Sequence, residues 1–229
     1  MPRNRDKSVN LVVDTVRLFL YLVVSMTSFF LLGDSISIHY GPFLKERIAA
    51  WATLGRKEGH IGNLDIAEGA NGGDSTLCLD YLTACFKKPD FKYDWLLLNC
   101  GAHDIRRGVE PPYALQTPPE KYAANLDAIA ALTRRHRQRL IWITTCPVFE
   151  EVHNKPSAMF HRFHADVKAY NAIARQWCER NDIPILDLYA FTLPHCPFAF
   201  CDHAHFAEPF RVLQAQFLAT ELKTIGEQY

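Results

Sequence analysis

The stretch "FFLLGDSISIHYGPFL" occupies residues 29–44 and joins an apolar run to a Gly-Asp-Ser triplet at 33–35. A short apolar run bounded by turn residues predicts a buried strand. Asp34 and Ser35 are residue types that cap helices, so the triplet predicts the start of a helix directly after the strand. A serine in this place either presents its hydroxyl at the rim of a sheet or serves only as a helix cap.

The rest of the chain alternates strand-like and helix-like segments. Further strand candidates are short apolar runs, and with the first they cover residues 28–33, 64–70, 95–101, 140–147 and 183–189. Helical patterns begin after Thr76 and after Pro118-Pro119, and they extend over residues 163–177 and about 209–225. Strands that alternate with helices predict a three-layer α/β/α domain whose five-stranded parallel sheet is covered on both faces.

Composition limits the domain count and the class of partner. The chain has 229 residues with 48% hydrophobic content, which is enough for one sizeable core, so we expect a single domain. Lys plus Arg and Asp plus Glu are balanced at 25 each, which argues against a nucleic-acid partner and favours a small, roughly neutral molecule. The seven cysteines are scattered through strand and helix segments, and we expect most of them to be reduced core residues.

Residues 1–25 are predicted to form an extension ahead of a domain at 26–229. Basic residues precede the apolar stretch "LFLYLVVSMTSFFLLG" at 18–33, which is typical of the start of a signal sequence. The stretch is too short to span a bilayer comfortably, and it runs directly into the Gly-Asp-Ser triplet. We therefore expect no stable membrane span and an extra helix or edge segment, with a signal peptide or a mis-set start codon as alternatives. The cytoplasm is favoured over secretion.

Polar residues also follow the last predicted strand. The segment "CPFAFCDHAHFAEPF" at 196–210 places Asp202 three residues before His205. In a parallel α/β sheet the functional loops lie at the carboxyl ends of the strands, where Ser35 is also expected. Asp202 there can accept the Nδ1 proton of His205 and leave Nε2 free to remove a proton from the Ser35 hydroxyl. The pattern predicts a serine nucleophile with its base and orienting acid.

Two more strand ends carry glycine beside polar residues. These are "EGANGGDST" at 68–76 and "NCGAHDIRRG" at 99–108. Glycine lets a backbone amide approach a ligand closely, as an oxyanion site requires. We interpret Asp34 and Asp104 as helix caps or loop ties rather than as catalytic carboxylates.

The ordered blocks resemble those of the SGNH hydrolases, also called GDSL-type esterases and lipases, over roughly residues 28–222. The resemblance implies the flavodoxin-like SGNH hydrolase fold, with Ser35 as the nucleophile and Asp202 and His205 as its partners. It also implies a serine esterase that works through an acyl-enzyme and needs no metal or organic cofactor.

The resemblance further assigns three oxyanion donors. The amide of Ser35 is the first, and the glycine of the second block corresponds to Gly73, with Gly72 as its neighbouring alternative. The third block of the family is usually Gly-x-Asn-Asp, and here it reads Gly-Ala-His-Asp at 101–104, so His103 stands in place of the asparagine.

The substrate class also follows from resemblance. The segments "GAHDIRRG", "TTCPVFEE" and "LDLYAF" are similar to those of a Gly-x-His-Asp subgroup whose members are commonly taken to be esterases of acylated sugars. We therefore expect a small-molecule or glycan ester with a short acyl group, above all acetyl. His39 and Tyr40 follow the nucleophile by about one helical turn and are candidates for the substrate pocket, with core packing as the alternative.

Other residues and functions stay open at this point. His203 is expected to point away from the triad as a partly exposed loop residue, and Arg106 and Arg107 either bind an anionic part of a substrate or stay in water. Within the same fold, the alternatives are an acyltransferase, a lysophospholipase or a thioesterase. A non-catalytic glycan-binding protein and a zinc module built on "HCPFAFCDHAH" at 195–205 represent another class.

Overall fold

The computed structural model describes residues 26–228, and the prediction for residues 1–25 lies outside them. The described strands are β1 Thr27–Leu32, β2 Ala52–Arg56, β3 Trp95–Leu98, β4 Arg139–Ile143 and β5 Ile185–Leu186. They form one parallel sheet in the order β2-β1-β3-β4-β5, which is the flavodoxin-like order. The predicted three-layer α/β/α fold with a five-stranded parallel sheet is confirmed.

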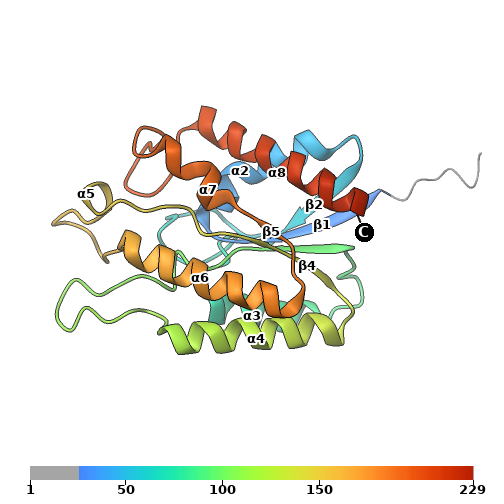
Figure 1. Cartoon of the computed structure of the whole chain (residues 1–229), viewed down its shortest axis with the longest axis horizontal. Helices are drawn as coiled ribbons and strands as arrows, with labels where there is room; N and C mark the ends of the chain where they lie inside the picture. The colour runs from blue at the N-terminus through green and yellow to red at the C-terminus, as the bar shows by residue number, and fades with distance from the viewer. Residues whose placement is uncertain (1–25, 229) are drawn as a thin grey trace, which may run out of the picture.

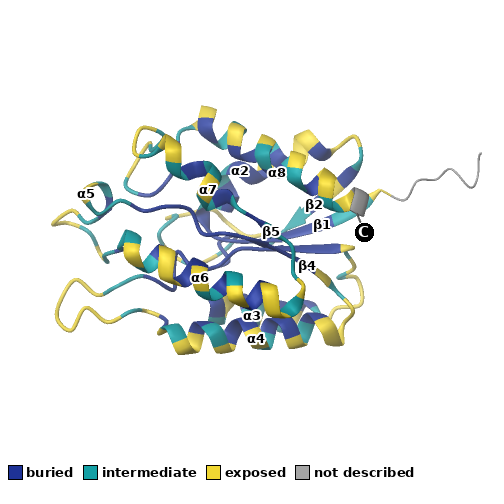
Figure 2. Ribbon diagram, in the orientation of Figure 1, coloured by how far each residue is buried: buried dark blue, intermediate teal, exposed yellow. Residues whose placement is uncertain are grey.

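Helices cover both faces of this sheet (Figure 1). They are α2 Ser35–Ile48, α3 Ser75–Cys85, α4 Pro119–Arg135, α5 Glu150–His153, α6 His164–Asn181, α7 Leu188–Thr192 and α8 Glu208–Gln228, with a 3₁₀ turn η1 at Leu193–His195. Helices α2, α7 and α8 lie on one face, and α3, α4 and α6 lie on the other. Buried residues concentrate in the sheet and on the inward faces of the helices (Figure 2).

The alternation along β1 shows why its sequence is continuously apolar. Phe29 and Leu31 pack in the core beneath α2 and α8, whereas Phe30 and Leu32 pack against α3, α4 and α6. Successive side chains of a strand point to opposite faces, so a strand covered on both sides needs apolar residues at every position. This burial fixes β1 in the sheet and sets Gly33, Asp34 and Ser35 at its carboxyl end.

One predicted strand is wrong. Residues 64–70 form a loop, and the strand that pairs with β1 on its outer side is β2. β2 is an edge strand of mixed burial that contains Gly55, so its sequence lacks the apolar run that marks the central strands. Gly69 has φ +53° and Ile66 is 45% exposed, both of which fit a loop better than a buried strand.

The predicted helix starts agree with the structure. Asp34 is the N-cap of α2, where its carboxylate accepts a hydrogen bond of 2.9 Å from the amide of Ile36. The helices predicted after residues 76, 119, 163 and 209 correspond to α3, α4, α6 and α8. All seven cysteines are free and five are buried, as expected. No helix within residues 26–228 has both the length and the apolar character needed to cross a membrane.

Candidate active site

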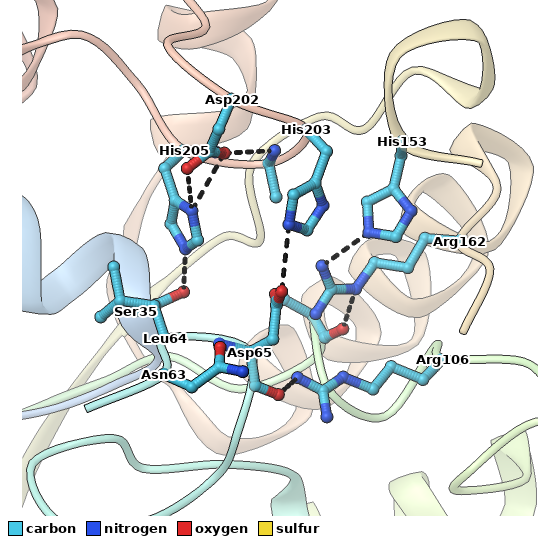
Figure 3. Close-up of polar contacts among 12 residues, drawn as sticks. Ser35, Asn63, Leu64, Asp65, Arg106, His153, Arg162, Asp202, His203 and His205 are labelled. Carbon is cyan, nitrogen blue, oxygen red and sulfur yellow. Dashed lines mark hydrogen bonds and ion pairs between the residues drawn. The ribbon is translucent and has the colours of Figure 1, made fainter. Parts of the chain in front are cut away.

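Ser35, His205 and Asp202 form a hydrogen-bonded chain at the carboxyl edge of the sheet (Figure 3). The Ser35 hydroxyl lies 2.8 Å from His205 Nε2, and His205 Nδ1 lies 2.8 Å from Asp202 Oδ2. Ser35 begins α2 directly after β1, whereas the other two residues precede α8, so two elements that are distant in sequence supply the site. The order of atoms allows His205 to remove the Ser35 proton while Asp202 fixes the imidazole tautomer.

The loop that carries Asp202 and His205 holds its own geometry. Asp202 Oδ1 accepts hydrogen bonds from the backbone amides of Ala204 at 2.8 Å and of His205 at 2.7 Å. Partial burial alone would raise the pKa of Asp202, but these amide bonds and the adjacent imidazole hold it at about 2. The carboxylate is therefore ionised at every working pH and can stabilise a positive charge on His205.

The second glycine-rich loop lies against the nucleophile. The amide of Gly72 donates to the carbonyl of Gly33 at 2.9 Å, which joins this loop to the Gly-Asp-Ser triplet. Gly73 has φ +75°, a conformation that favours glycine, and a Cβ there would lie 2.6 Å from the side chain of Leu77. The amide of Gly73 donates to Asn71 Oδ1 at 2.9 Å, so Gly73 can serve an oxyanion only if that bond is released or shared.

His103 is 1% exposed, and neither of its ring nitrogens has a hydrogen-bond partner among the described residues. Burial lowers its pKa well below the ordinary value, and the positive charges of Arg106 and Arg162 lower it further. The imidazole is therefore neutral and carries one N–H donor. A buried donor without a partner calls for an explanation, and an oxyanion on the substrate is an acceptor that would supply one.

The loop that carries His103 is anchored on both sides. Gly101 has φ +141°, and a Cβ there would lie only 2.3 Å from Thr145 Oγ1, so this close approach requires glycine. Asp104 accepts hydrogen bonds from the amide of Ser75 at 3.0 Å and from its hydroxyl at 2.6 Å. The interpretation of Asp104 as a loop tie is confirmed, because it joins the third block to the start of α3.

We expect the buried carboxyl of Asp104 to make stability fall as pH rises. Burial raises its pKa to about 6 against the opposing effect of the Ser75 hydrogen bonds, whereas an unfolded chain has a pKa of about 3.9. Between these values only the folded state retains the proton, so the free energy of unfolding should decrease by about 2–3 kcal/mol as pH rises. Urea unfolding from about pH 4 to about pH 7 measures this decrease, which Asp104→Asn should lack. An equal decrease in both proteins would assign it to other groups.

Of the two residues predicted to line the substrate pocket, His39 lies at the site and Tyr40 does not. Tyr40 is 1% exposed and lies in the core with the residues of α8, so it packs and presents no surface to a substrate. His39 lies beside the triad, with its ring centroid 5.1 Å from that of His205 in an edge-to-face arrangement. Burial, and to a smaller extent the electrostatic effects of Arg211 and His205, lower the pKa of His39 to about 4. His39 is therefore neutral and forms one side of the site next to His205.

His203 is partly exposed, as expected, but it does not point away from the triad. Its Nε2 lies 3.1 Å from Asp65 Oδ2, and its ring packs against His153 at a centroid distance of 4.8 Å. The hydrogen bond from His203 lowers the pKa of Asp65, and the same contact raises the pKa of His203. The pair ties the loop of Asp202 and His205 to the loop at residues 58–69. A His-x-His spacing gives no signal for this contact, because its partner lies 138 residues away.

Three arginines near His103 in sequence or in space, Arg106, Arg107 and Arg162, have different roles. Arg107 forms an ion pair with Asp166 at 2.7 Å and takes no part in the site. Arg162, which sequence reasoning missed, is 4% exposed and donates from Nε to the carbonyl of Ala102 at 2.6 Å. Arg106 donates to the backbone carbonyl of Asp65. Arg162 thus holds the backbone just before His103, and nothing in the local pattern of its sequence marks it.

Within residues 26–228, no three His, Cys, Asp or Glu side chains are grouped so that they could hold a metal ion. In the segment considered for zinc, Asp202 and His205 bond to each other and His203 bonds to Asp65. The Sγ atom of Cys196 instead donates to the carbonyl of Thr192.

Comparison with solved structures supports the fold. A lipase/acylhydrolase from Enterococcus faecalis matches with a TM-score of 0.63 at 18% identity, over 87% of this chain and 96% of its own. The acetyl xylan esterase AlAXEase matches with a TM-score of 0.61 at 15% identity, over 85% of this chain and 98% of its own. The C-terminal catalytic domain of peptidoglycan O-acetyltransferase A from Streptococcus pneumoniae matches with a TM-score of 0.59 at 18% identity. The match covers 88% of this chain and 96% of that domain.

The sequence itself identifies the family. No curated protein matches the chain. A family model, however, matches residues 31–211, which include the Gly-Asp-Ser triplet, both glycine-rich loops and the Asp-x-x-His pair. Because this match spans well over half of the sequence, the chain belongs to the GDSL-like lipase/acylhydrolase family.

Proposed function

We propose that the protein is a serine esterase that hydrolyses short acyl esters of carbohydrates, with Ser35 as nucleophile, His205 as base and Asp202 as orienting acid. The observation that carries the proposal is the hydrogen-bonded chain from Ser35 Oγ through His205 to Asp202. Among the described residues, no other serine hydroxyl is hydrogen-bonded to a histidine that itself contacts a carboxylate. Membership of an acylhydrolase family agrees with this chemistry.

The mechanism follows from the atoms in contact. His205 Nε2 takes the hydroxyl proton as Ser35 Oγ bonds to the carbonyl carbon of the ester. The bond from that carbon to the alcohol oxygen then breaks, and His205 returns the proton to the departing alcohol. Water attacks the acyl-enzyme with the same base, the acid leaves, and Ser35 regains its proton. Asp202, held ionised by the amides of its own loop, stabilises the protonated imidazole in both steps.

The oxyanion of each tetrahedral intermediate is bound by the amide of Ser35 and by His103, with Gly73 as the third donor once Asn71 releases its amide. His103 is buried, neutral and without a partner, which supports its role as the replacement for an asparagine. The histidine at this position supports our assignment of the chain to a subgroup with Gly-x-His-Asp as its third block. Losing one donor of such a site costs on the order of 3 kcal/mol in transition-state stabilisation.

An acetyl group on a carbohydrate is the substrate that we favour. The loop at residues 110–119 is rich in proline and exposed at residues 110–114, which is unlike the long apolar lid of a lipase. The structures with a similar fold include an acetyl xylan esterase and a peptidoglycan O-acetyltransferase, whose names both indicate acetyl groups on polymers that contain sugars.

We expect the rate to fall as the acyl chain grows. With 4-nitrophenyl esters from acetyl to decanoyl, kcat/KM should be highest for acetyl, because Asp34 and His103, the buried residues that we place next to the nucleophile and its oxyanion, are polar and give a long acyl chain little apolar surface. Acetate release from acetylated xylan and simple sugar acetates extends the test to the alcohol. Rates that rise steadily toward decanoyl would instead indicate a lipase or thioesterase.

A further inference from the structure

A pocket of about 200 Å³ lies beside the triad. Three loops line it with the side chains of Asp65, His153, Lys155, Ser157, Ala158, Met159, Phe160 and His203. His203 connects it to the triad, since its ring centroid is 6.0 Å from that of His205. Figure 3 shows His203 and Asp65 between His205 and Arg162. Our account of hydrolysis assigns none of these pocket residues a role.

The pocket is surrounded by positive charge. Lys155 and His203 line it directly, and the guanidinium groups of Arg106 and Arg162 lie over the ring of Phe160 at 4.1 and 4.8 Å. Among the described residues, no carboxylate lies within 4.0 Å of either guanidinium. The one carboxylate in the lining belongs to Asp65 and is bonded to His203.

Burial of the charged Arg106 and Arg162 side chains costs free energy. Arg162 is 4% exposed, and its donors reach only the neutral acceptors Ala102 O and His153 Nε2. Burial, and to a smaller extent the nearby charge of Arg106, lowers the pKa of Arg162 to about 9, and burial lowers that of Arg106 to about 10. Both remain charged at neutral pH, and the carboxylates of Asp65 and Asp34 that attract them lie beyond ion-pair distance. An anion bound nearby would offset this cost, because opposite charges attract strongly where water is excluded.

The position of the pocket indicates which part of an ester it holds. His205 Nε2 must reach the alcohol oxygen in order to protonate it, so the alcohol leaves on the side of His205. His203, on the same loop, forms the boundary between that side and the pocket. The oxyanion donors, among them His103, hold the carbonyl oxygen of the ester instead.

We propose that this pocket binds the alcohol part of the substrate and selects an alcohol that carries a carboxylate, as in a uronic acid. The carboxylate lies near Lys155 and His203, within the field of the two arginines, and the ring of Phe160 contacts the C–H face of the sugar. Nδ1 of His203 is buried and has no partner among the described residues. Because Nε2 donates to the Asp65 carboxylate, Nδ1 donates to the bound anion when the imidazole is protonated, the form that the contact with Asp65 favours by raising the pKa of His203. The proposal rests on the esterase function proposed above, although its binding step can be tested separately.

The first test uses a matched pair of esters: the O-acetylated methyl glycosides of glucuronic acid and of glucuronamide, which differ only in charge. Wild-type enzyme should show a kcat/KM for acetate release about tenfold higher for the acid, the effect of one charge-assisted contact. Lys155→Gln should bring the ratio close to one. Lys168→Gln is the control, because Lys168 is exposed on α6 and its loss changes the net charge equally; the ratio should stay at the wild-type value. Added salt should lower the preference of the wild-type enzyme for the acid over the amide.

The second test measures binding without chemistry. The unacetylated methyl glycosides of glucuronic acid and glucuronamide are titrated into Ser35→Ala and followed by NMR. Tighter binding of the acid, lost with Lys155→Gln, supports the pocket even if no ester is hydrolysed, in which case only the esterase function fails. Equal binding of acid and amide, with equal kcat/KM for the two esters, would overturn the anionic subsite and leave the esterase function standing.

Discussion

Ser35→Ala should lower kcat by about 10⁴-fold or more while the protein stays folded. The side chain supplies the only atom that we expect to bond to the acyl group, and His205 has no other hydroxyl in contact to activate. The lost hydroxyl makes one hydrogen bond, so the free energy of unfolding should change by about 1 kcal/mol. For a chain of this size that is a Tm shift of about 2–4 °C. Hydrolysis of 4-nitrophenyl acetate and thermal unfolding measure the two effects.

Ser37→Ala is the matched control. Ser37 lies in the same first turn of α2, is 1% exposed, and donates its hydroxyl to the carbonyl of Asp34 at 2.6 Å. The substitution removes one buried hydrogen bond of the same kind but leaves His205 untouched. We expect a similar Tm shift and nearly full activity. Wild-type turnover by Ser35→Ala would end the assignment of the nucleophile.

His103→Ala should lower kcat by about 100-fold or more with little change in KM, because an oxyanion donor acts mainly in the transition state. The imidazole is buried and neutral and has no hydrogen-bond partner within residues 26–228, so its N–H is free to bind a developing negative charge. His103→Asn, which restores an N–H donor, should recover part of the loss. Since both donors are neutral, the pH profile of kcat should keep its shape.

Two further measurements separate donation from packing at this site. His103→Leu fills most of the space of the imidazole but has no donor, so it should be as slow as alanine even if its Tm is higher. Asparagine should be faster than leucine even if its Tm is lower. If leucine keeps the wild-type kcat, His103 only packs beneath the loop and the site works with backbone donors alone.

Central strands and helix starts could be predicted from the sequence because their causes are local. β1, β3 and β4 are buried on both faces and read as continuous apolar runs, and Asp34 marks the start of α2 as its cap. β2 could not be found this way, because an edge strand needs no such run and its place is set by pairing with β1.

Some contacts of the candidate site could likewise be predicted from the sequence, and others could not. Asp202 and His205 are three residues apart, so one loop fixes their contact and their spacing in sequence reveals it. The contact between Asp65 and His203 joins distant loops and depends on the finished fold. Arg162 stands 60 residues from Ala102, whose carbonyl it binds, and lies in a segment with no distinguishing pattern. Such residues become visible only when the packing of loops is known.

The packing of α2 against α8 has a consequence for how the protein is made. Leu44 and Ile48 of α2 share a core with Leu218 and Leu222 of α8, which follows every other described element in the chain. A growing polypeptide therefore leaves the ribosome with the apolar face of α2 uncovered until α8 has been synthesised. Nascent chains would hold Ser35 without its base during that time. Early chains are both inactive and prone to aggregate, which makes this helix face a natural point of contact for chaperones.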